Sequence, residues 1–362
     1  MSSASGIFET IILELRPRLQ SVNAFVSLSK EPEYVEVVLG KESIRVITDK
    51  GLDEIPCGDI NAVQCSLSGM KICDKFLTFR FATNNPLEIG GFKTELLQNT
   101  VASIESLSNK PLLSNNTVYT IQCLNCGKSL TDSVKFDRVL PLPSENSDAS
   151  DWFCHGHGNQ MNGFSLNPKK TDCFYSQCFV HIHSESVANV KCSGKLAVCR
   201  FCLQWLGIQQ NPTTIRLWFN TVKFVGSNSC VSTSSLQDAF KTIRNSFKYS
   251  VHSTVRVILT CQTSSSQVDA VLIWILEKNL QILFNGSGSV KKHEVAKVLF
   301  KLAGSDEPTL KMWQDDAMVS SFSVSKIMMV DLLKHLHKFN KMFPSEYSKS
   351  NEFKISYLLL YD

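Results

Sequence analysis

Cys123-Leu-Asn-Cys126-Gly127 and Cys199-Arg-Phe-Cys202 are two C-x₂-C pairs with 72 residues between them. A C-x₂-C turn can point both thiolates at one tetrahedral ion, and two such turns form a closed four-sulfur zinc site. Gly127 suits the tight turn of a metal knuckle because glycine adopts positive φ angles without steric penalty. We therefore predict a structural zinc ion held by Cys123, Cys126, Cys199 and Cys202. The alternatives are unrelated buried thiols or a redox pair.

The zinc pairs enclose a segment of unusual composition, residues 121–210. Eight of the thirteen cysteines of the 362-residue chain lie in this segment, which is also rich in Pro, Gly, Ser and Asn. It has little periodic apolar surface, so it needs a metal or a partner to fold. A closed four-thiolate site performs no chemistry itself. It ties the two ends of the segment together, so that the loop between them projects as one unit.

Length and composition indicate a soluble intracellular protein of two domains, or three at most. Hydrophobic residues make up 43% and charged residues 19%, which excludes a disordered chain. The formal net charge is +4 without a block of five basic residues, so no direct nucleic-acid contact is predicted. No apolar run is long enough for a membrane helix. The run Thr10–Leu15 is broken by Glu14 and lacks a basic flank, so no secretory signal is predicted either.

These properties favour the cytoplasm and the nucleus as the location of the protein. Both compartments keep thiols reduced, so the thirteen cysteines are not expected to form a disulfide framework. Metal binding is the leading explanation for them.

Residues 1–120 predict a β-rich N-terminal domain. Apolar and polar residues alternate over 77–81, as in a half-buried strand. A short link containing Gly40 joins apolar stretches at 35–39 and 44–47, which indicates a hairpin.

Residues 211–362 predict a C-terminal α+β domain, because helical spacing and strand alternation both return there. The expected elements are helices over 236–247 and 325–339 and strands over 215–219, 255–261, 271–276 and 353–361. Together these patterns predict a mixed α+β, β-rich fold. It comprises an N-terminal β domain (1–120), a zinc-stapled irregular middle segment (121–210) and the C-terminal domain (211–362).

Inside the middle segment, Arg138-Val-Leu-Pro-Leu-Pro-Ser-Glu145 is followed by Asp151-Trp-Phe-Cys-His-Gly-His157. The alternating prolines force an extended path and remove backbone donors, so the apolar residues between them cannot all enter a sheet interior. The stretch is either a rigid strap over the protein's own surface or a recognition arm. The candidate partner-binding residues are Arg138, Leu140, Pro141, Leu142, Pro143, Trp152, Cys154 and His155.

No catalytic residue is assigned from the sequence. Cys154 and His155 are adjacent and point opposite ways on an extended chain, which gives a nucleophilic triad little support. A lone thiolate at Cys154 can instead coordinate a metal that belongs to another protein. Cys230 and Cys261 are the only cysteines after residue 203, and apolar alternation into Cys261 favours a buried strand there.

The motifs CLNCGKSL, RVLPLPSEN, DWFCH, TDCF and CRFC, in this order, resemble the HECT-like ubiquitin ligase family described as ubiquitin-conjugating-enzyme-binding proteins. The resemblance covers residues 118–205 well and the flanks by general layout. It implies a ubiquitin-protein transferase that binds a ubiquitin-conjugating enzyme through its C-terminal half. The implied transfer of ubiquitin includes transfer to the ligase itself, and the implied substrates include cyclin-type proteins.

The same resemblance implies a link to pre-mRNA 3′-end processing, through its metallo-β-lactamase-type endonuclease. In the family, the Trp-x-Cys-His stretch resembles a motif in which a cysteine reaches the partner's metal centre, and Cys154 occupies that place here. A non-catalytic assembly chaperone or inhibitor of this endonuclease is therefore the alternative to a ligase. In a third hypothesis, the zinc site and loop only complete a fold whose function lies in the C-terminal domain.

Overall fold

The computed structural model describes residues 6–16, 19–57, 60–84, 111–142, 167–227, 229–249, 255–264, 267–285 and 290–359. Strands dominate these residues and three α-helices accompany them. The predicted β-rich α+β class is therefore confirmed.

The largest sheet of the described chain has ten strands, drawn from both ends of the sequence. Its strand order is β23-β24-β21-β20-β1-β2-β7-β6, while β19 pairs with β20 and β22 pairs with β19. The strands are β1 (Phe8–Arg16), β2 (Ser21–Leu28), β6 (Ser68–Cys73), β7 (Phe76–Ala82), β19 (Val255–Gln262), β20 (Val268–Asn285), β21 (Val290–Ala303), β22 (Val319–Ser323), β23 (Lys349–Ser350) and β24 (Phe353–Leu358). The antiparallel pairing of β1 with β20 places Ile12 opposite Phe284, and so joins the two ends of the chain.

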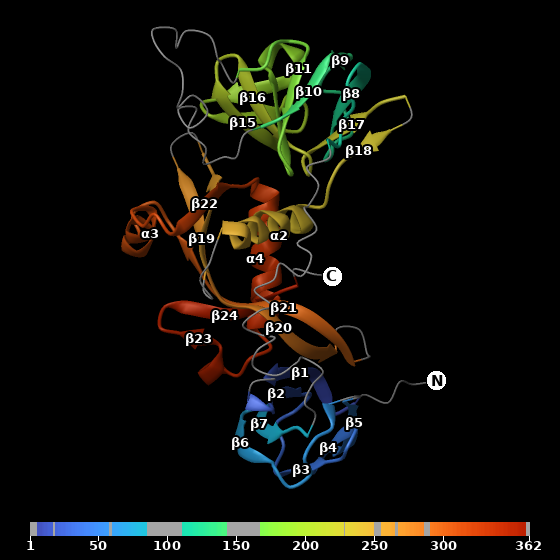
Figure 1. Ribbon diagram of the computed structural model, residues 1–362, viewed down its shortest axis with the longest axis vertical. Helices are drawn as coiled ribbons and strands as arrows, with labels where there is room; N and C mark the ends of the chain where they lie inside the picture. The colour runs from blue at the N-terminus through green and yellow to red at the C-terminus, as the bar shows by residue number, and fades with distance from the viewer. Residues whose placement is uncertain are drawn as a thin grey trace.

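A three-stranded sheet covers the N-terminal part of the large sheet, at the blue end of the ribbon in Figure 1. It consists of β3 (Val35–Leu39), β4 (Ser43–Thr48) and β5 (Gly51–Pro56). Leu77, Phe79 and Phe81 point into the core between the two sheets and are almost completely buried. Both the predicted strand and the predicted hairpin are thus confirmed.

The two C-x₂-C pairs lie in a separate pair of sheets, at the opposite end of the molecule (Figure 1). The seven-stranded sheet contains β10 (Arg138–Pro141), β11 (Asp172–Tyr175), β12 (Phe179–His183), β13 (Val190–Ser193), β14 (Leu196–Cys199), β15 (Trp205–Asn211) and β16 (Thr214–Trp218). The four-stranded sheet contains β8 (Thr117–Cys123), β9 (Val134–Phe136), β17 (Val222–Val225) and β18 (Cys230–Val231). One apolar core lies between them and includes Cys123 and Cys199.

The described part of residues 121–210 is thus more regular than the expected irregular segment. Its strands pair over long sequence distances, as when β8 pairs with β17. This pairing crosses the boundary expected at residue 210. Strand pairing does not by itself define an independently folding unit, so the division at 120 and 210 stays a prediction.

The helices are α2 (Ser235–Asn245), α3 (Pro308–Gln314) and α4 (Lys326–Asn340), and the predicted helices over 236–247 and 325–339 are confirmed. Helices α2 and α4 lie between the two sheets that carry the C-x₂-C pairs and the N-terminal strands (Figure 1). Ser325 caps α4, since its Oγ accepts a hydrogen bond from the Met328 N–H at 3.1 Å. No helix in the described ranges is both long enough and apolar enough to span a membrane.

Candidate metal centre and a buried charge cluster

The four predicted zinc ligands meet where the four-stranded and seven-stranded sheets adjoin. Cys123 ends β8 and Cys199 ends β14, and each is followed by a turn that carries the second cysteine of its pair. The four Sγ atoms all lie within 4.8 Å of one another. The Cys123 and Cys202 sulfurs are 3.7 Å apart, and those of Cys126 and Cys199 are 3.8 Å apart. Tetrahedral zinc with Zn–S bonds of about 2.3 Å requires sulfurs about 3.8 Å apart, so this set fits zinc.

The first turn has the hydrogen bonding of a metal knuckle. The N–H of Gly127 donates to the Cys123 carbonyl at 2.9 Å, and the N–H of Cys123 donates to the Lys128 carbonyl at 3.0 Å. Gly127 has a φ of +70°, as its position after the second cysteine predicted.

The second turn repeats this pattern with different residues. The N–H of Leu203 donates to the Cys199 carbonyl at 2.9 Å, and the N–H of Cys199 donates to the Gln204 carbonyl at 2.9 Å. Leu203 has a φ of +59°, although this region costs an L-residue about 1–2 kcal/mol. The spacing did not predict that a leucine would adopt the conformation that glycine adopts in the first turn.

The backbone of each turn also donates hydrogen bonds to a cysteine sulfur. Backbone N–H groups of Asn125 and Cys126 hydrogen-bond the Cys123 sulfur, and Cys199 receives the same pair of hydrogen bonds from its own turn. Burial raises the pKa of Cys123 to about 12. Burial also acts to raise the pKa of Cys202, but hydrogen bonds, first of all from Asn125, outweigh it and lower that pKa to about 6. Because metal binding must deprotonate every thiol, affinity rises with pH.

Part of the predicted partner-binding stretch forms β10, an edge strand that runs parallel to β11. Arg138 holds it through a bidentate pair with Asp172, with Nε–Oδ1 and Nη2–Oδ2 distances of 2.8 and 2.7 Å. These hydrogen bonds lower the pKa of Asp172. Leu140 remains 42% exposed, whereas Leu142 packs against the core that includes α2 and α4. This part is therefore a strap on the protein's own surface that leaves Leu140 and Pro141 exposed.

The remaining predicted partner-binding residues, Pro143, Trp152, Cys154 and His155, lie outside the described residues. Of the other two candidate thiols, Cys261 lies in β19 and is only 2% exposed, as the strand pattern predicted. Burial raises its pKa to about 11, so the unreactive thiol form prevails at neutral pH. Cys230 is exposed in β18.

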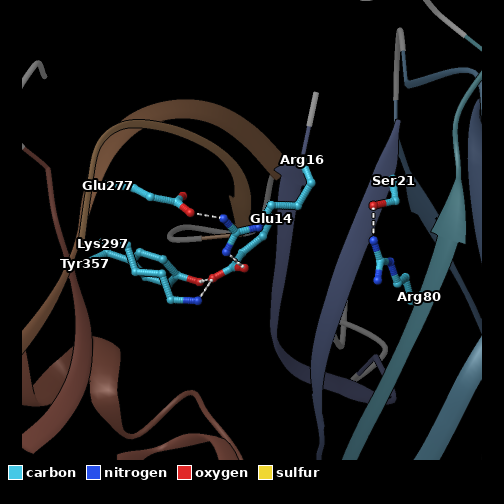
Figure 2. Close-up of polar contacts among 7 residues, drawn as sticks. All are labelled: Glu14, Arg16, Ser21, Arg80, Glu277, Lys297 and Tyr357. Carbon is cyan, nitrogen blue, oxygen red and sulfur yellow. Dashed lines mark hydrogen bonds and ion pairs between the residues drawn. The ribbon is translucent and has the colours of Figure 1, made fainter. Parts of the chain in front are cut away.

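A buried cluster of charges, which the sequence interpretation missed, lies where β1 meets the C-terminal strands. The fully buried Glu14 carboxylate accepts hydrogen bonds from Lys297 Nζ at 2.6 Å and from Arg16 Nη2 at 2.8 Å. The Tyr357 hydroxyl donates to the same carboxylate, and Arg16 also pairs with Glu277 (Figure 2). The partners come from β1, β20, β21 and β24, so the cluster ties the two ends of the chain together.

The cluster is held in its charged form. Burial alone would raise the pKa of Glu14, but the charges of Lys297 and Arg16 outweigh it and keep the pKa below its ordinary value. Burial raises the pKa of Tyr357 well above its ordinary value, so this hydroxyl stays a donor. The signal in the sequence was a single carboxylate inside the apolar run Thr10–Leu15.

The fold and the cysteine cluster define a β-rich α+β protein whose described residues bring four thiols together, close enough to hold a metal ion, at the junction of two sheets. The chain belongs to the family described as HECT-like ubiquitin-conjugating enzyme (E2)-binding, whose model matches residues 14–355. The resemblance inferred from the cysteine and proline motifs is therefore confirmed.

Relatives align over nearly the full chain. It is 23% identical to an E3 ubiquitin-protein ligase of Homo sapiens in an alignment that covers 98% of this chain and 99% of the relative. It is 24% identical to the ligase of the same name from Mus musculus in an alignment that covers 96% of this chain and 97% of that relative. No solved structure matches the chain. The family and these names support an E2-binding, ubiquitin-ligase-like role with a ubiquitin-conjugating enzyme as partner.

Proposed function

We propose that the protein binds a ubiquitin-conjugating enzyme and promotes ubiquitin transfer, including transfer to itself, by holding the charged enzyme beside an acceptor. In this step the lysine amine of the acceptor attacks the thioester on the conjugating enzyme. An amide forms, and the enzyme's cysteine leaves as a thiol. The observation that carries the proposal is the match to an E2-binding family over residues 14–355. We further propose that it works in the reducing cytoplasm and nucleus, where the four thiols can hold zinc.

Scaffolding is favoured over a thioester on this chain because Cys261 is a poor nucleophile. Its side chain is nearly inaccessible, and burial keeps its pKa at about 11. A thioester would require attack by its thiolate on the enzyme-bound ubiquitin. Cys230, which is exposed, and Cys154 are the thiols that the test must also examine.

We expect a Cys261→Ala variant to discharge ubiquitin from a charged conjugating enzyme within about twofold of the unsubstituted rate, since one small buried group contributes little to transfer. The measurement is single-turnover discharge on non-reducing gels, with a panel of conjugating enzymes. Cys57→Ala, at another thiol that is 2% exposed, controls for the loss of a buried sulfur.

Scaffolding also predicts that no thiol-sensitive ubiquitin adduct forms on the chain. An adduct that disappears only in Cys261→Ala, Cys230→Ala or Cys154→Ala would instead identify a catalytic cysteine and overturn scaffolding. Failure of the protein to stimulate discharge from any conjugating enzyme would overturn the ligase proposal itself.

A second function, as partner of a metallo-β-lactamase-type endonuclease, is favoured by one observation. Strand β10 lies at a sheet edge, and its Leu140, which precedes the Trp-x-Cys-His stretch in the sequence, is 42% exposed. An edge strand with an outward apolar side chain can receive another protein. In this proposal Cys154 supplies a thiolate to an open position at the partner's zinc.

For this second function we expect Cys154→Ala to weaken the complex with the endonuclease by at least about tenfold, because a metal–thiolate bond is lost. The measurement is a dissociation constant with zinc-loaded and with zinc-free endonuclease. Cys65→Ala is the matched control, since Cys65 is exposed and its removal leaves no cavity. Equal affinity of the two variants, or binding that does not depend on the partner's zinc, would contradict the proposal.

A further inference from the structure

The two metal knuckles present apolar side chains to solvent. Leu124, between the cysteines of the first pair, is 41% exposed. Phe201, between those of the second pair, is 52% exposed, and Leu203, directly after that pair, is 68% exposed. The sulfurs of Cys123 and Cys202, the immediate neighbours of these residues, lie 3.7 Å apart. The three side chains therefore project from two turns that meet at one point, and we call them the knuckle surface.

The side chain of Leu203 contributes little to the fold, although its backbone N–H closes the second knuckle. Gly127 occupies the equivalent position of the first knuckle, where a left-handed backbone carries no steric penalty. Leu203 adopts the same conformation at a steric cost, yet most of its side chain makes no contact with the protein. Folding alone would favour glycine at this position. A large apolar side chain at an exposed, left-handed position indicates a role other than folding, and we infer that this role is contact with a partner protein.

The surroundings of the knuckle surface are basic. Residues 111–142 and 167–227, which form the described part of the zinc-bearing sheets, contain ten Lys and Arg but only four Asp and Glu. Lys128 and Arg200 lie in the knuckles themselves and are exposed. Neither forms an ion pair with another described residue. A protein that covers the surface must therefore bring an apolar contact within an acidic rim.

We propose that Leu124, Phe201 and Leu203 form the docking surface for the ubiquitin-conjugating enzyme, which contributes an apolar contact surrounded by acidic residues. This inference rests on the proposed function, since it assigns a place to the partner that the family description names.

The metal gives this surface its rigidity. Four sulfur ligands and the hydrogen bonds of both turns fix the knuckles, so little conformational entropy remains to be lost when the enzyme docks. The zinc site then has a role in recognition without taking part in chemistry. Removal of the metal should abolish binding together with the geometry of the surface.

The test measures the dissociation constant between the full zinc-loaded chain and conjugating enzymes, by calorimetry, for three variants. Leu203→Gly removes the exposed side chain and relieves the left-handed backbone, so it should fold at least as well as the unsubstituted chain. Phe201→Ser removes the aromatic ring. Leu302→Ser is the matched control, because Leu302 is 58% exposed on β21, far from the knuckles in sequence and in another sheet.

We expect Leu203→Gly and Phe201→Ser each to weaken binding at least about tenfold while zinc content and thermal midpoint are kept, and Leu302→Ser to bind normally. Arg200→Glu should weaken binding, and most strongly at low salt, because it places a negative charge against the acidic rim of the partner.

Three results would overturn the inference. If Leu203→Gly and Phe201→Ser both bind the enzyme as tightly as the unsubstituted chain does, the enzyme docks elsewhere and the proposed function stands. If the variants lose affinity for free ubiquitin but not for the enzyme, the assigned partner is wrong. If the unsubstituted chain binds no conjugating enzyme, the proposed function fails together with the inference.

Discussion

Replacement of Cys199 by serine is expected to release the metal and to unfold the zinc-bearing sheets. Structural zinc contributes about 10–16 kcal/mol of apparent binding free energy in small metal-dependent domains at neutral pH. That is comparable to the whole stability of a domain, about 5–15 kcal/mol. Cys199 is completely buried in the core shared by the seven-stranded and four-stranded sheets, so its loss also exposes that core.

Two measurements check this result. Zinc released by a thiol-modifying reagent should fall from one ion per chain to near zero, and the urea unfolding curve should lose its cooperative transition or shift far to lower denaturant. Cys192→Ser is the control, because Cys192 lies in β13 next to β14 but outside the four-sulfur cluster. A Cys199→Ser protein that kept both its zinc and its midpoint would contradict the assignment of these cysteines as ligands.

The cluster of four thiols was largely predictable because its determinants are local. The spacing within each C-x₂-C pair and Gly127 after the first pair specify a knuckle, and reduced thiols in a chain of this kind favour metal ligation. The pairing of the two knuckles was the remaining inference, and it is confirmed by the four sulfurs within 4.8 Å. The left-handed Leu203 was not predictable, since its conformation is imposed by the hydrogen bonds of the turn rather than by residue preference.

The large sheet was predictable only in pieces. Alternation shows which residues of a strand face the core, but not which strand lies beside it, so the pairing of β1 with β20 left no trace in the sequence. Strand β20 was predicted only over 271–276, although it runs from Val268 to Asn285. Shifts of register between Ile275 and Leu280 interrupt its alternation, and a broken period ends a sequence-based prediction.

Replacement of Glu14 by glutamine is expected to destabilise the chain by about 3–5 kcal/mol, the usual cost of removing one partner from a buried ion pair. Glutamine keeps the size of the side chain but leaves Lys297 and Arg16 with one negative charge fewer. Both cations are mostly buried, so water can compensate only in part. Because Tyr357 also donates to Glu14, the side-chain contacts of β1 with β21 and with β24 should weaken together. The measurement is urea unfolding at pH 7.

The same cluster predicts how this difference depends on pH. The pKa of Glu14 in the folded protein lies below its ordinary value of 4.5. Its contribution to the free energy of unfolding is therefore complete above the unfolded-state pKa and is lost as the pH falls through the folded-state pKa. The difference in the free energy of unfolding between the unsubstituted protein and Glu14→Gln should therefore become smaller below about pH 4.5. Glu9→Gln is the control: Glu9 lies in the same strand and pairs with Lys75 at the surface, where such a pair contributes about 1 kcal/mol or less. A gap between unsubstituted protein and Glu14→Gln no larger than this, or one that stays constant down to pH 3, would show that the cluster does not hold the two ends of the chain together.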